Sequence, residues 1–257
     1  MIAMELREIL EQHRLWLNGE GGKRADLRGV YLLHADLSYT DLPYADMSNA
    51  DLSYADLSHA DLSYVDLSHA DLSYADMSNV CLSHTNLSYT DLFHANLSYT
   101  NLSGANMGYA TMRGVDLCGA TLRGANMTNA DLCGAKLDDV KYDYSTSFFA
   151  LQCPEEGSFI GYKKACSHIV KLEILPDAKR SSATTHKCRC NAAKVISITT
   201  LDGKDDGTRT VSSDYDNRFE YRVGEIVRVD NFDENRWDEC STGIHFFITR
   251  DEAVNYN

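Results

Sequence analysis

The chain has 257 residues, of which 44% are hydrophobic and only three are proline, and its formal net charge at pH 7 is −14. This composition is typical of a folded chain of one or two domains and argues against disorder. The negative charge disfavours direct binding to nucleic acid or to an anionic membrane and favours a basic partner. No apolar run approaches the roughly 18 residues of a membrane span, and charges interrupt the first leucines, so we expect a cytoplasmic protein without a signal peptide.

The first segment, residues 1–24, places Leu6, Ile9, Leu10 and His13 at the spacing of one helix face. The pattern predicts an amphipathic helix between residues 4 and 17. We interpret this helix as a cap, because the open end of a repeat structure exposes backbone and apolar side chains. A free helix that binds a partner is the alternative.

Residues 25–139 consist of 23 consecutive units of five residues. Position one of each unit is Ala, Val or Thr, position three is Leu or Met, and no unit departs from this rule. A period of five fits neither a helix nor a continuous strand, and the polar residues at positions four and five break the alternation of a strand. The chain therefore turns a corner at every unit, which predicts a narrow coil around a core of Ala and Leu.

Units such as residues 55–59 (ADLSH) and 95–99 (ANLSY) read A(D/N)LXX and closely resemble the pentapeptide-repeat family. The resemblance implies a mainly β fold, a right-handed quadrilateral β-helix with four units per coil, in which residues twenty apart stack. Stacked coils of this kind bury a face that no single unit buries alone.

Position two points outward in such a coil and is Asp in 13 units and Asn in five, so the fold tolerates an uncharged residue there. Asp residues stacked about 4.8 Å apart repel by roughly 1 kcal/mol per pair in water, a cost that Asn avoids. We therefore interpret the run of Asp in nine consecutive units as an interaction surface, with solubility alone or recent duplication of one unit as alternatives. The run comprises Asp36, Asp41, Asp46, Asp51, Asp56, Asp61, Asp66, Asp71 and Asp76.

Position five is mostly Tyr or His as far as Tyr99 and mostly Gly afterwards. We expect Tyr54, Tyr64 and Tyr74 to belong to the interaction surface, because aromatic side chains add contact area at a small entropic cost. Packing of stacked rings at the corners of the coil is an equally open alternative.

Residues 140–147 lack the period and are expected to form a linker to a separate domain, residues 148–257, of small α+β or mostly β type. A helix is expected from residue 250. The domain resembles an uncharacterised domain that follows pentapeptide repeats in phage and bacterial proteins, and this resemblance implies no activity. Short β-rich apolar runs predict strands at residues 159–162, 169–174, 194–198, 219–223, 226–229 and 244–248.

A catalytic or ligand-binding site in this domain is a second hypothesis, with Arg180, Ser181, Ser182, Trp237 and His245 as its candidates. A Ser or Cys nucleophile needs His245 within hydrogen-bond reach. No GxSxG, P-loop or HExxH pattern is present. We therefore expect no enzyme and no cofactor, and the sequence leaves residues 148–257 open on this point.

The eight cysteines are expected to be free thiols, since three of them replace an ordinary outward residue of the repeat. Metal-ligand residue types do gather in the C-terminal domain, but without the paired CxxC spacing of most zinc sites. We expect no metal, with a structural zinc as the alternative. The residues concerned are Cys153, Cys166, His168, His186, Cys188 and Cys190.

Some pentapeptide-repeat proteins act as DNA mimics that bind type II topoisomerases. The resemblance, together with the charge, implies an acidic protein-interaction module and a DNA-mimic-type inhibitor of a host nucleic-acid-binding enzyme. Its partner is then a basic protein surface, on a type II topoisomerase or on a nucleic-acid-guided or defence nuclease, in a bacterium or an infected host cell. A repeat that serves as spacer for a catalytic or ligand-binding domain and a structural scaffold are the alternatives, and a homo-oligomer stays open.

Overall fold

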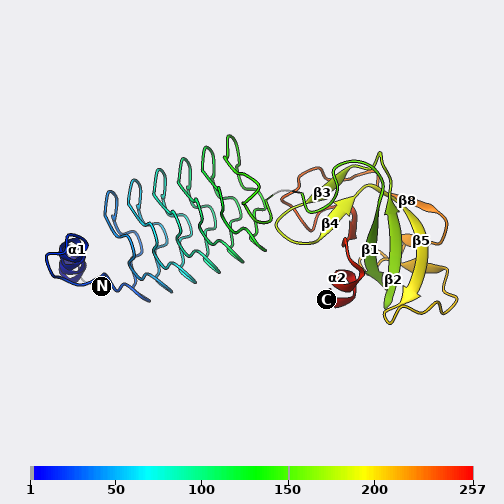
Figure 1. The fold of residues 1–257 in the computed structure, drawn as a ribbon, viewed down its shortest axis with the longest axis horizontal. Coiled ribbons are helices and arrows are strands. Elements are labelled where there is room, and N and C mark those ends of the chain that lie inside the picture. Colours follow the sequence, from blue (N-terminus) through cyan, green and yellow to red (C-terminus); the bar gives the residue numbers. More distant parts are fainter. Residues whose placement is uncertain (1–2, 150, 257) are drawn as a thin grey trace. The chain divides into compact units, whose positions relative to one another are not determined.

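The structure is a computed structural model that describes residues 3–149 and 151–256. The chain forms two compact units, residues 1–150 and residues 151–257 (Figure 1). The first unit contains helix α1 and the repeat, and the second contains strands β1 to β9 and helix α2. No helix within these described ranges has both the length and the apolar character needed to cross a membrane.

In the repeat, position two of each unit forms a parallel bridge with position two of the unit twenty residues later, as Asp56 does with Asp76. Hydrogen bonds flank this bridge: Asp56 N donates to the Ala35 carbonyl (2.9 Å), and Leu57 N donates to the Asp76 carbonyl (2.8 Å). Twenty residues therefore make one coil of four units, and the coils stack as a ladder along the unit (Figure 1). The prediction of a quadrilateral β-helix is confirmed.

Each unit ends in a tight turn at position five. Ala55 N donates to the Leu52 carbonyl (3.0 Å), and Tyr54 between them has a φ of 58°. A positive φ at the third residue of a four-residue turn is the signature of a type II turn. The corner predicted at every unit is this turn, and the left-handed backbone recurs at position five throughout residues 25–139.

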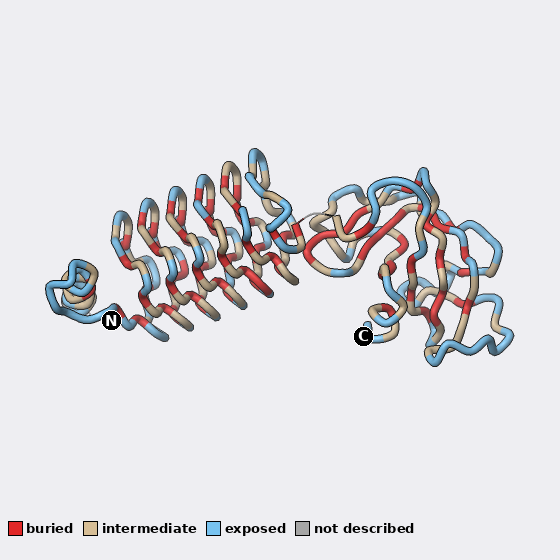
Figure 2. Tube along the Cα trace, in the orientation of Figure 1, coloured by how far each residue is buried: buried red, intermediate tan, exposed pale blue. Residues whose placement is uncertain are grey.

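Positions one and three fill the axis of the coil. Leu57 and Met77 are fully buried and lie one coil apart, because the residues before them, Asp56 and Asp76, are bridged. Figure 2 shows this buried pattern repeating along the coils. The three buried threonines at position one add no unpaired hydroxyl to the core, since each donates to a carbonyl of the coil before it: Thr85 to Leu62, Thr90 to Leu67 and Thr100 to Met77.

The aromatic rings at position five stack in columns at the corners. The ring centroids of Tyr54 and Tyr74 are 4.8 Å apart with their planes at 8°, and those of Tyr44 and Tyr64 are 5.0 Å apart. Glycine follows the last ring of three columns, at Gly104, Gly114 and Gly119, and an added Cβ at Gly119 would lie 2.7 Å from the Tyr99 ring. Stacked corner packing, left open by the sequence, is therefore present.

Helix α1 (Ala3–Leu17) lies at the start of the repeat (Figure 1). The buried His13 accepts, through Nδ1, a hydrogen bond from the backbone N–H of Ala25, the first residue of the repeat (3.0 Å). The Trp16 ring stacks on His13 and meets the Tyr44 ring edge-on, with centroids 5.5 and 6.4 Å apart. These contacts hold α1 against the first coil, which is the arrangement of a cap rather than of a free helix.

The end of the repeat differs from the expected boundary. Residues 140–147, expected as a linker, continue the coil, since Lys141 bridges Thr121 and Ser147 bridges Asn126. The second of these pairs is 21 residues apart, so one extra residue hides the period from the sequence. The buried Thr146 repeats the internal threonine contact by donating to the Leu122 carbonyl (2.8 Å), and the buried Phe149, expected in the second domain, also belongs to the first unit.

The second unit is built from small antiparallel sheets. A four-stranded sheet has the order β1 (Phe159–Ala165), β2 (His168–Ile174), β5 (Ala192–Thr200) and β8 (Ile226–Arg228). A second sheet has the order β3 (Arg180–Ser182), β4 (Cys188–Cys190) and β9 (Ile244–Phe246), and β6 (Thr210–Ser212) pairs with β7 (Glu220–Arg222). Helix α2 (Arg250–Asn255) begins at a capping box formed by Thr249 and Glu252 and packs near β1.

The six strands and the terminal helix predicted in this unit are all present, whereas β3, β4 and β6 were missed. Each missed strand has only three residues, of mostly polar or cysteine sequence, so no apolar alternation marks it. Their backbone pairing places them in sheets. The core includes Leu172, Ile174, Val195, Ile198 and Phe246.

The cap predicts a transition in acid. Burial lowers the pKa of His13, and the nearby Pro43 carbonyl offsets this only in part, without forming an aligned hydrogen bond. Histidine titrates near 6.5 when unfolded, so below that pH the released helix gains a proton that the docked helix resists. The free energy that holds α1 against the first coil is therefore fully present above about pH 6.5. It is lost as the pH falls toward the lowered pKa of docked His13, because a protonated Nδ1 no longer accepts the hydrogen bond from Ala25 N.

In a Trp237→Phe background, where Trp16 is the remaining tryptophan, we expect its emission to shift to longer wavelength between about pH 7 and pH 5. A His13→Gln variant, which does not titrate, should lack this transition. A wild-type spectrum that does not change with pH, or an unchanged transition in the Gln variant, would contradict the role of His13.

Candidate functional site

All the aspartates at position two except Asp41 have one oxygen engaged in the turn of their own unit, and Asp41 differs because Pro43, two residues further along, has no N–H. Oδ1 of Asp56 accepts a hydrogen bond from Ser58 N (2.9 Å), and Oδ1 of Asp66 accepts one from Ser68 N (2.9 Å). This is the local side-chain contact by which Asp and Asn favour turns. The side chains are exposed or half-buried, so the carboxylates face outward.

Asparagine performs the same task and adds a contact between coils. Asn96 Oδ1 accepts from Ser98 N (3.1 Å), while its Nδ2 donates to Oδ1 of Asp76 in the coil before it (3.1 Å). The same contact links Asn126 to Asn106 at 2.9 Å. An ionised Asp has no proton to donate, so it cannot replace this contact. Where it stacks on Asp or Asn, Asn at position two therefore adds a contact between coils that a pair of ionised Asp side chains cannot form.

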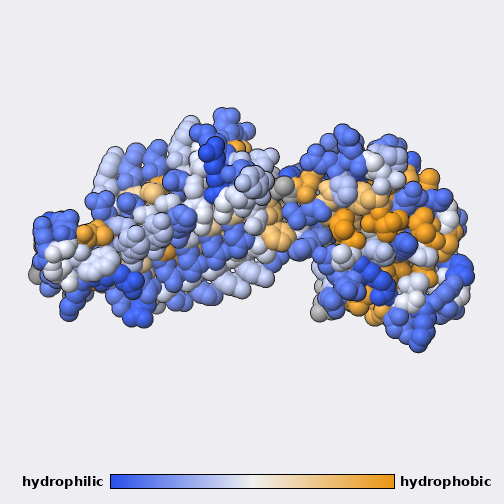
Figure 3. All heavy atoms as spheres, in the orientation of Figure 1, coloured by the Kyte–Doolittle hydropathy of each residue, from blue (hydrophilic) through white to orange (hydrophobic). Residues whose placement is uncertain are grey.

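The structure brings the nine predicted aspartates together on three successive coils. Along the coil axis Asp36, Asp56 and Asp76 form one column, and the other three columns are paired as Asp41 with Asp61, Asp46 with Asp66, and Asp51 with Asp71. We call these nine residues the acidic belt. Hydrophilic residues cover most of the repeat on the face shown in Figure 3.

Few cations neutralise this belt. In the described part of the repeat, Asp46 is the one member with a cation within 4 Å, Arg28, whose Nε lies 3.7 Å away. Arg28 is bound more closely to Asp26 (2.6 Å) and lowers the pKa of that carboxyl to about 2. Hydrogen bonds from Ser38 lower the pKa of Asp36. The lowered pKa values of Asp26 and Asp36 keep these two carboxyls charged at neutral pH.

Tyr54, Tyr64 and Tyr74 stand at the corners beside the belt. They are 50%, 49% and 45% exposed even though their rings stack, so each presents a ring edge and a hydroxyl to solvent. Stacking fixes the rings, which reduces the entropy lost when a partner binds them. Corner packing and an outward contact surface are therefore compatible at these residues.

Of the C-terminal candidates, Arg180 has a structural role. Its guanidinium donates to the carbonyls of Pro154, Gly157 and Leu175, at 2.9, 2.6 and 2.8 Å, and lies over the Phe159 ring. It ties together loops near β3, and these carbonyls leave it little capacity to bind a substrate. Ser182 is engaged similarly, since its hydroxyl accepts from Gln152 N (2.8 Å).

Ser181 and His245 share one row of the second sheet but do not form a catalytic pair. Ser181 lies opposite Arg189, and Arg189 lies opposite His245. Strands are spaced by about 4.8 Å, so Ser181 and His245 are roughly 10 Å apart, beyond hydrogen-bond reach. Trp237 stacks with Arg236 (4.4 Å) in the loop before β9, and His245 Nε2 contacts the Glu239 carbonyl (3.1 Å).

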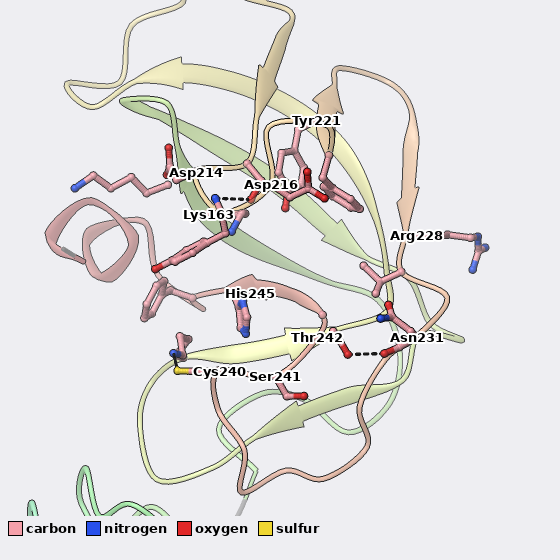
Figure 4. Close-up of a pocket in the computed structure, with 18 of the residues that line it drawn as sticks. Lys163, Asp214, Asp216, Tyr221, Arg228, Asn231, Cys240, Ser241, Thr242 and His245 are labelled. Atoms are coloured by element: carbon pink, nitrogen blue, oxygen red, sulfur yellow. Dashed lines mark hydrogen bonds between the residues drawn. The ribbon is translucent and has the colours of Figure 1, made fainter. Parts of the chain in front are cut away.

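The sequence missed a pocket of about 800 Å³ in the second unit, which His245 helps to line (Figure 4). Figure 4 shows Lys163, Asp216 and Tyr221 on one side of the pocket and Thr242 and Cys240 on the other. Burial, with neighbouring Lys163, Lys187 and Arg189, lowers the pKa of His245 to about 4. Burial likewise lowers the pKa of Lys163 to about 8.

One signal for this pocket was present in the sequence. Along β1, Gly161, Lys163 and Ala165 are buried on one side of the strand. A lysine at the inward position of an alternating strand is unusual, because burying its ammonium is costly. The remaining lining residues come from loops and from strands β1, β7, β8 and β9, and no local sequence pattern shows that these distant segments meet.

The cysteines and histidines of the C-terminal domain that have the residue types of metal ligands do not come together in space. Within residues 3–149 and 151–256, no group of three or more His, Cys, Asp or Glu side chains has a metal-binding arrangement. Cys188 and Cys190 lie in the core, whereas His168 pairs with Asp206 (3.0 Å) and His186 with Glu252 (2.9 Å). Burial raises the pKa of Cys190 to about 12, which keeps it a thiol.

Among solved structures, HetL of Nostoc sp. strain PCC 7120, a pentapeptide-repeat protein involved in heterocyst differentiation regulation, is 35% identical over 46% of this chain, with a TM-score of 0.32. The chain spans 60% of the length of HetL. Rfr23 of Cyanothece 51142 is 35% identical over 52% of this chain and 93% of its own, with a TM-score of 0.36. A trypsin-treated form of QnrB1, a plasmid-mediated fluoroquinolone resistance protein, is 21% identical over 48% of this chain and 86% of its own, with a TM-score of 0.24.

No curated protein matches the chain significantly. Residues 23–53, 50–88, 85–124 and 100–139 match the family model described as pentapeptide repeats (8 copies). Residues 149–253 match the model described as family of unknown function (DUF5758). The chain therefore belongs to the pentapeptide-repeat family and carries a DUF5758 domain after its repeat.

Proposed function

We propose that the chain is an acidic protein-interaction module whose belt occupies a DNA-binding surface of another protein. The observation that carries the proposal is the equivalence of Asn and Asp at position two. Asn96 makes the turn contact that Asp56 makes, and it also binds the neighbouring coil. The charge of the belt is therefore not required by the fold, which supports a role in binding a partner.

The charge density of the belt supports a DNA-like role. The coil from residue 46 to residue 65 carries four aspartates, Asp46, Asp51, Asp56 and Asp61. At about 4.8 Å per coil, four carboxylates give roughly one charge per 1.2 Å of axis, close to the one per 1.7 Å of duplex DNA. Later coils lack this density, because Asn, Thr and Cys replace most of the aspartates.

The partner is then a basic surface that normally holds nucleic acid. Type II topoisomerases and nucleic-acid-guided or defence nucleases present such surfaces, and occupation of that surface inhibits the enzyme. Attraction between the belt and Lys or Arg residues falls as salt screens it. The exposed edges of Tyr54, Tyr64 and Tyr74 would add direct contacts beside the charges.

Substitution of Asp46, Asp56, Asp66 and Asp76 by Asn separates charge from fold. Each new Asn can extend a ladder that already links Asn86 to Asp66 and Asn96 to Asp76. We expect the free energy of unfolding of the repeat to stay the same or to rise by up to about 3 kcal/mol, from added hydrogen bonds and relieved repulsion. Urea unfolding measures it, and a loss of more than about 1 kcal/mol would contradict the equivalence of Asn and Asp.

The same fourfold variant tests the binding. We expect the wild-type chain to displace labelled duplex DNA from a bacterial type II topoisomerase or a guide-loaded nuclease, and the variant to do so at least about tenfold less well. A matched control removes four carboxylates from the other unit, by Glu155→Gln, Glu156→Gln, Asp177→Asn and Asp251→Asn, and should compete like the wild type. Equal potency of the belt variant and the wild type, or displacement from neither enzyme, would refute the mechanism.

A further inference from the structure

The pocket of the second unit contains a buried cation that the protein itself does not pair. Lys163 is only 7% exposed, on the inward side of β1. Within the described residues its ammonium has no hydrogen bond or ion pair, and its nearest aromatic contact is the Tyr221 ring, whose centroid is 5.8 Å away. Figure 4 shows Lys163 beside the pocket, on the same side as Tyr221.

The second buried cation of this unit shows what a structural role looks like. Arg189 is 2% exposed and donates to three carbonyls, of Asp233, Thr242 and Asn235, at 3.2, 3.0 and 2.7 Å. It also lies over the Phe232 ring, 5.5 Å from the centroid. Buried charges are normally paired in this way, because an unpaired charge is strongly unfavourable away from water. Lys163 departs from this rule, and it does so at the wall of the pocket.

The carboxylates that line the pocket are partly engaged elsewhere. Asp214 accepts a hydrogen bond from Cys166 N (2.9 Å), and Asp216 pairs with Arg218 (3.2 Å). Lys187 adds a second cation to the lining. Its ammonium contacts the Cys240 sulfur at 3.8 Å and has no carboxylate partner among the described residues.

The pocket also offers an apolar wall. Phe219, Tyr221 and Phe247 line it, and its volume of about 800 Å³ lies within the range of small-molecule sites. Binding sites of this kind combine an apolar lining with a few polar groups that fix orientation. The lining carries charges of both signs, but Lys163 and Lys187 form no ion pair among the described residues, so these two cations favour an anionic ligand.

We propose that this pocket binds a small organic anion, with its phosphate or carboxylate against Lys163 and Lys187 and its aromatic body against Phe219, Tyr221 and Phe247. The ligand supplies the negative charge that Lys163 lacks. This site is independent of the acidic belt, so the module would combine a protein-binding repeat with a ligand-binding domain. Burial lowers the pKa of Lys163 to about 8, and the charge of nearby Asp214, which forms no ion pair with it, offsets this only in part.

Phenyl phosphate and benzoate are probes that share an aromatic ring and differ in the anion, and phenol is their uncharged counterpart. With the full chain at low salt, we expect at least one of the two anions to bind about tenfold or more tightly than phenol, as measured by calorimetry. The tighter anion identifies whether phosphate or carboxylate is recognised. Affinities of both anions no better than that of phenol would overturn the proposal.

Lys163→Met removes the charge and keeps an apolar side chain of similar length, and we expect it to weaken anion binding at least tenfold, as loss of a charged hydrogen bond does. Lys194→Met, on an exposed position of β5, is the matched control and should bind like the wild type. In the wild-type chain, NMR of 13C-labelled lysine provides a readout that requires no variant to fold. The anion should move the ε-carbon signals of Lys163 and Lys187 and leave that of Lys194 in place, and the opposite pattern, or undiminished binding by Lys163→Met, would refute the site.

Discussion

The twenty-residue ladder of backbone hydrogen bonds is the constraint on which the repeat depends. Because Asp56 N must reach the Ala35 carbonyl and Leu57 N the Asp76 carbonyl, every residue lies over its counterpart in the neighbouring coil. Side chains of the same kind therefore stack on one another from coil to coil. For leucine and tyrosine this produces a dry core and columns of rings, whereas for aspartate it produces columns of equal charges. In the acidic belt, the backbone hydrogen bonds therefore hold carboxylates close together although these carboxylates repel one another.

Aspartate at position two stabilises the turn of its own unit but repels the aspartate in the neighbouring coil. Aspartate keeps its turn contact with the residue two further along, so the local fold is retained, while the repulsion between coils is left to solvent and salt. Where Asn replaces it, the same position binds across the coils instead. The change from Asp to Asn along the chain thus separates a charged region from one in which position two contributes to stability. A partner with a basic groove would supply the counter-charges that the belt lacks.

Much of the repeat was predictable because its period repeats the same physical argument 23 times. The Ala and Leu core and the corner at every unit follow from residue size and polarity, whereas the four units per coil, and with them the columns of Asp, were implied by the resemblance to the pentapeptide-repeat family. The end of the coil was not predictable, because one extra residue before Ser147 breaks the period while the ladder continues. In the second unit, apolar alternation found the longer strands but not Arg180–Ser182 or Cys188–Cys190, whose positions depend on pairing with distant segments.

The pocket lay outside the reach of the sequence for a related reason. Lys163 could be placed on the inward side of its strand, but Lys187, Phe219 and His245 come from separate loops and strands, and only tertiary structure brings them together. Conversely, Arg180 and Ser181 have the residue types of a functional site, but Arg180 binds backbone carbonyls and Ser181 lies opposite Arg189 of the neighbouring strand β4.

The central claim is that the belt holds like charges together at a cost to the fold. The most direct test is to measure hydrogen exchange of the Leu57 and Leu62 amides at increasing concentrations of sodium chloride, because the exchange rate reports the local stability of the repeat. If the account is right, these amides become better protected as salt rises from about 0.02 to 0.5 M, because screening relieves the repulsion between coils. Protection that is independent of salt, or that falls as salt rises, would contradict it.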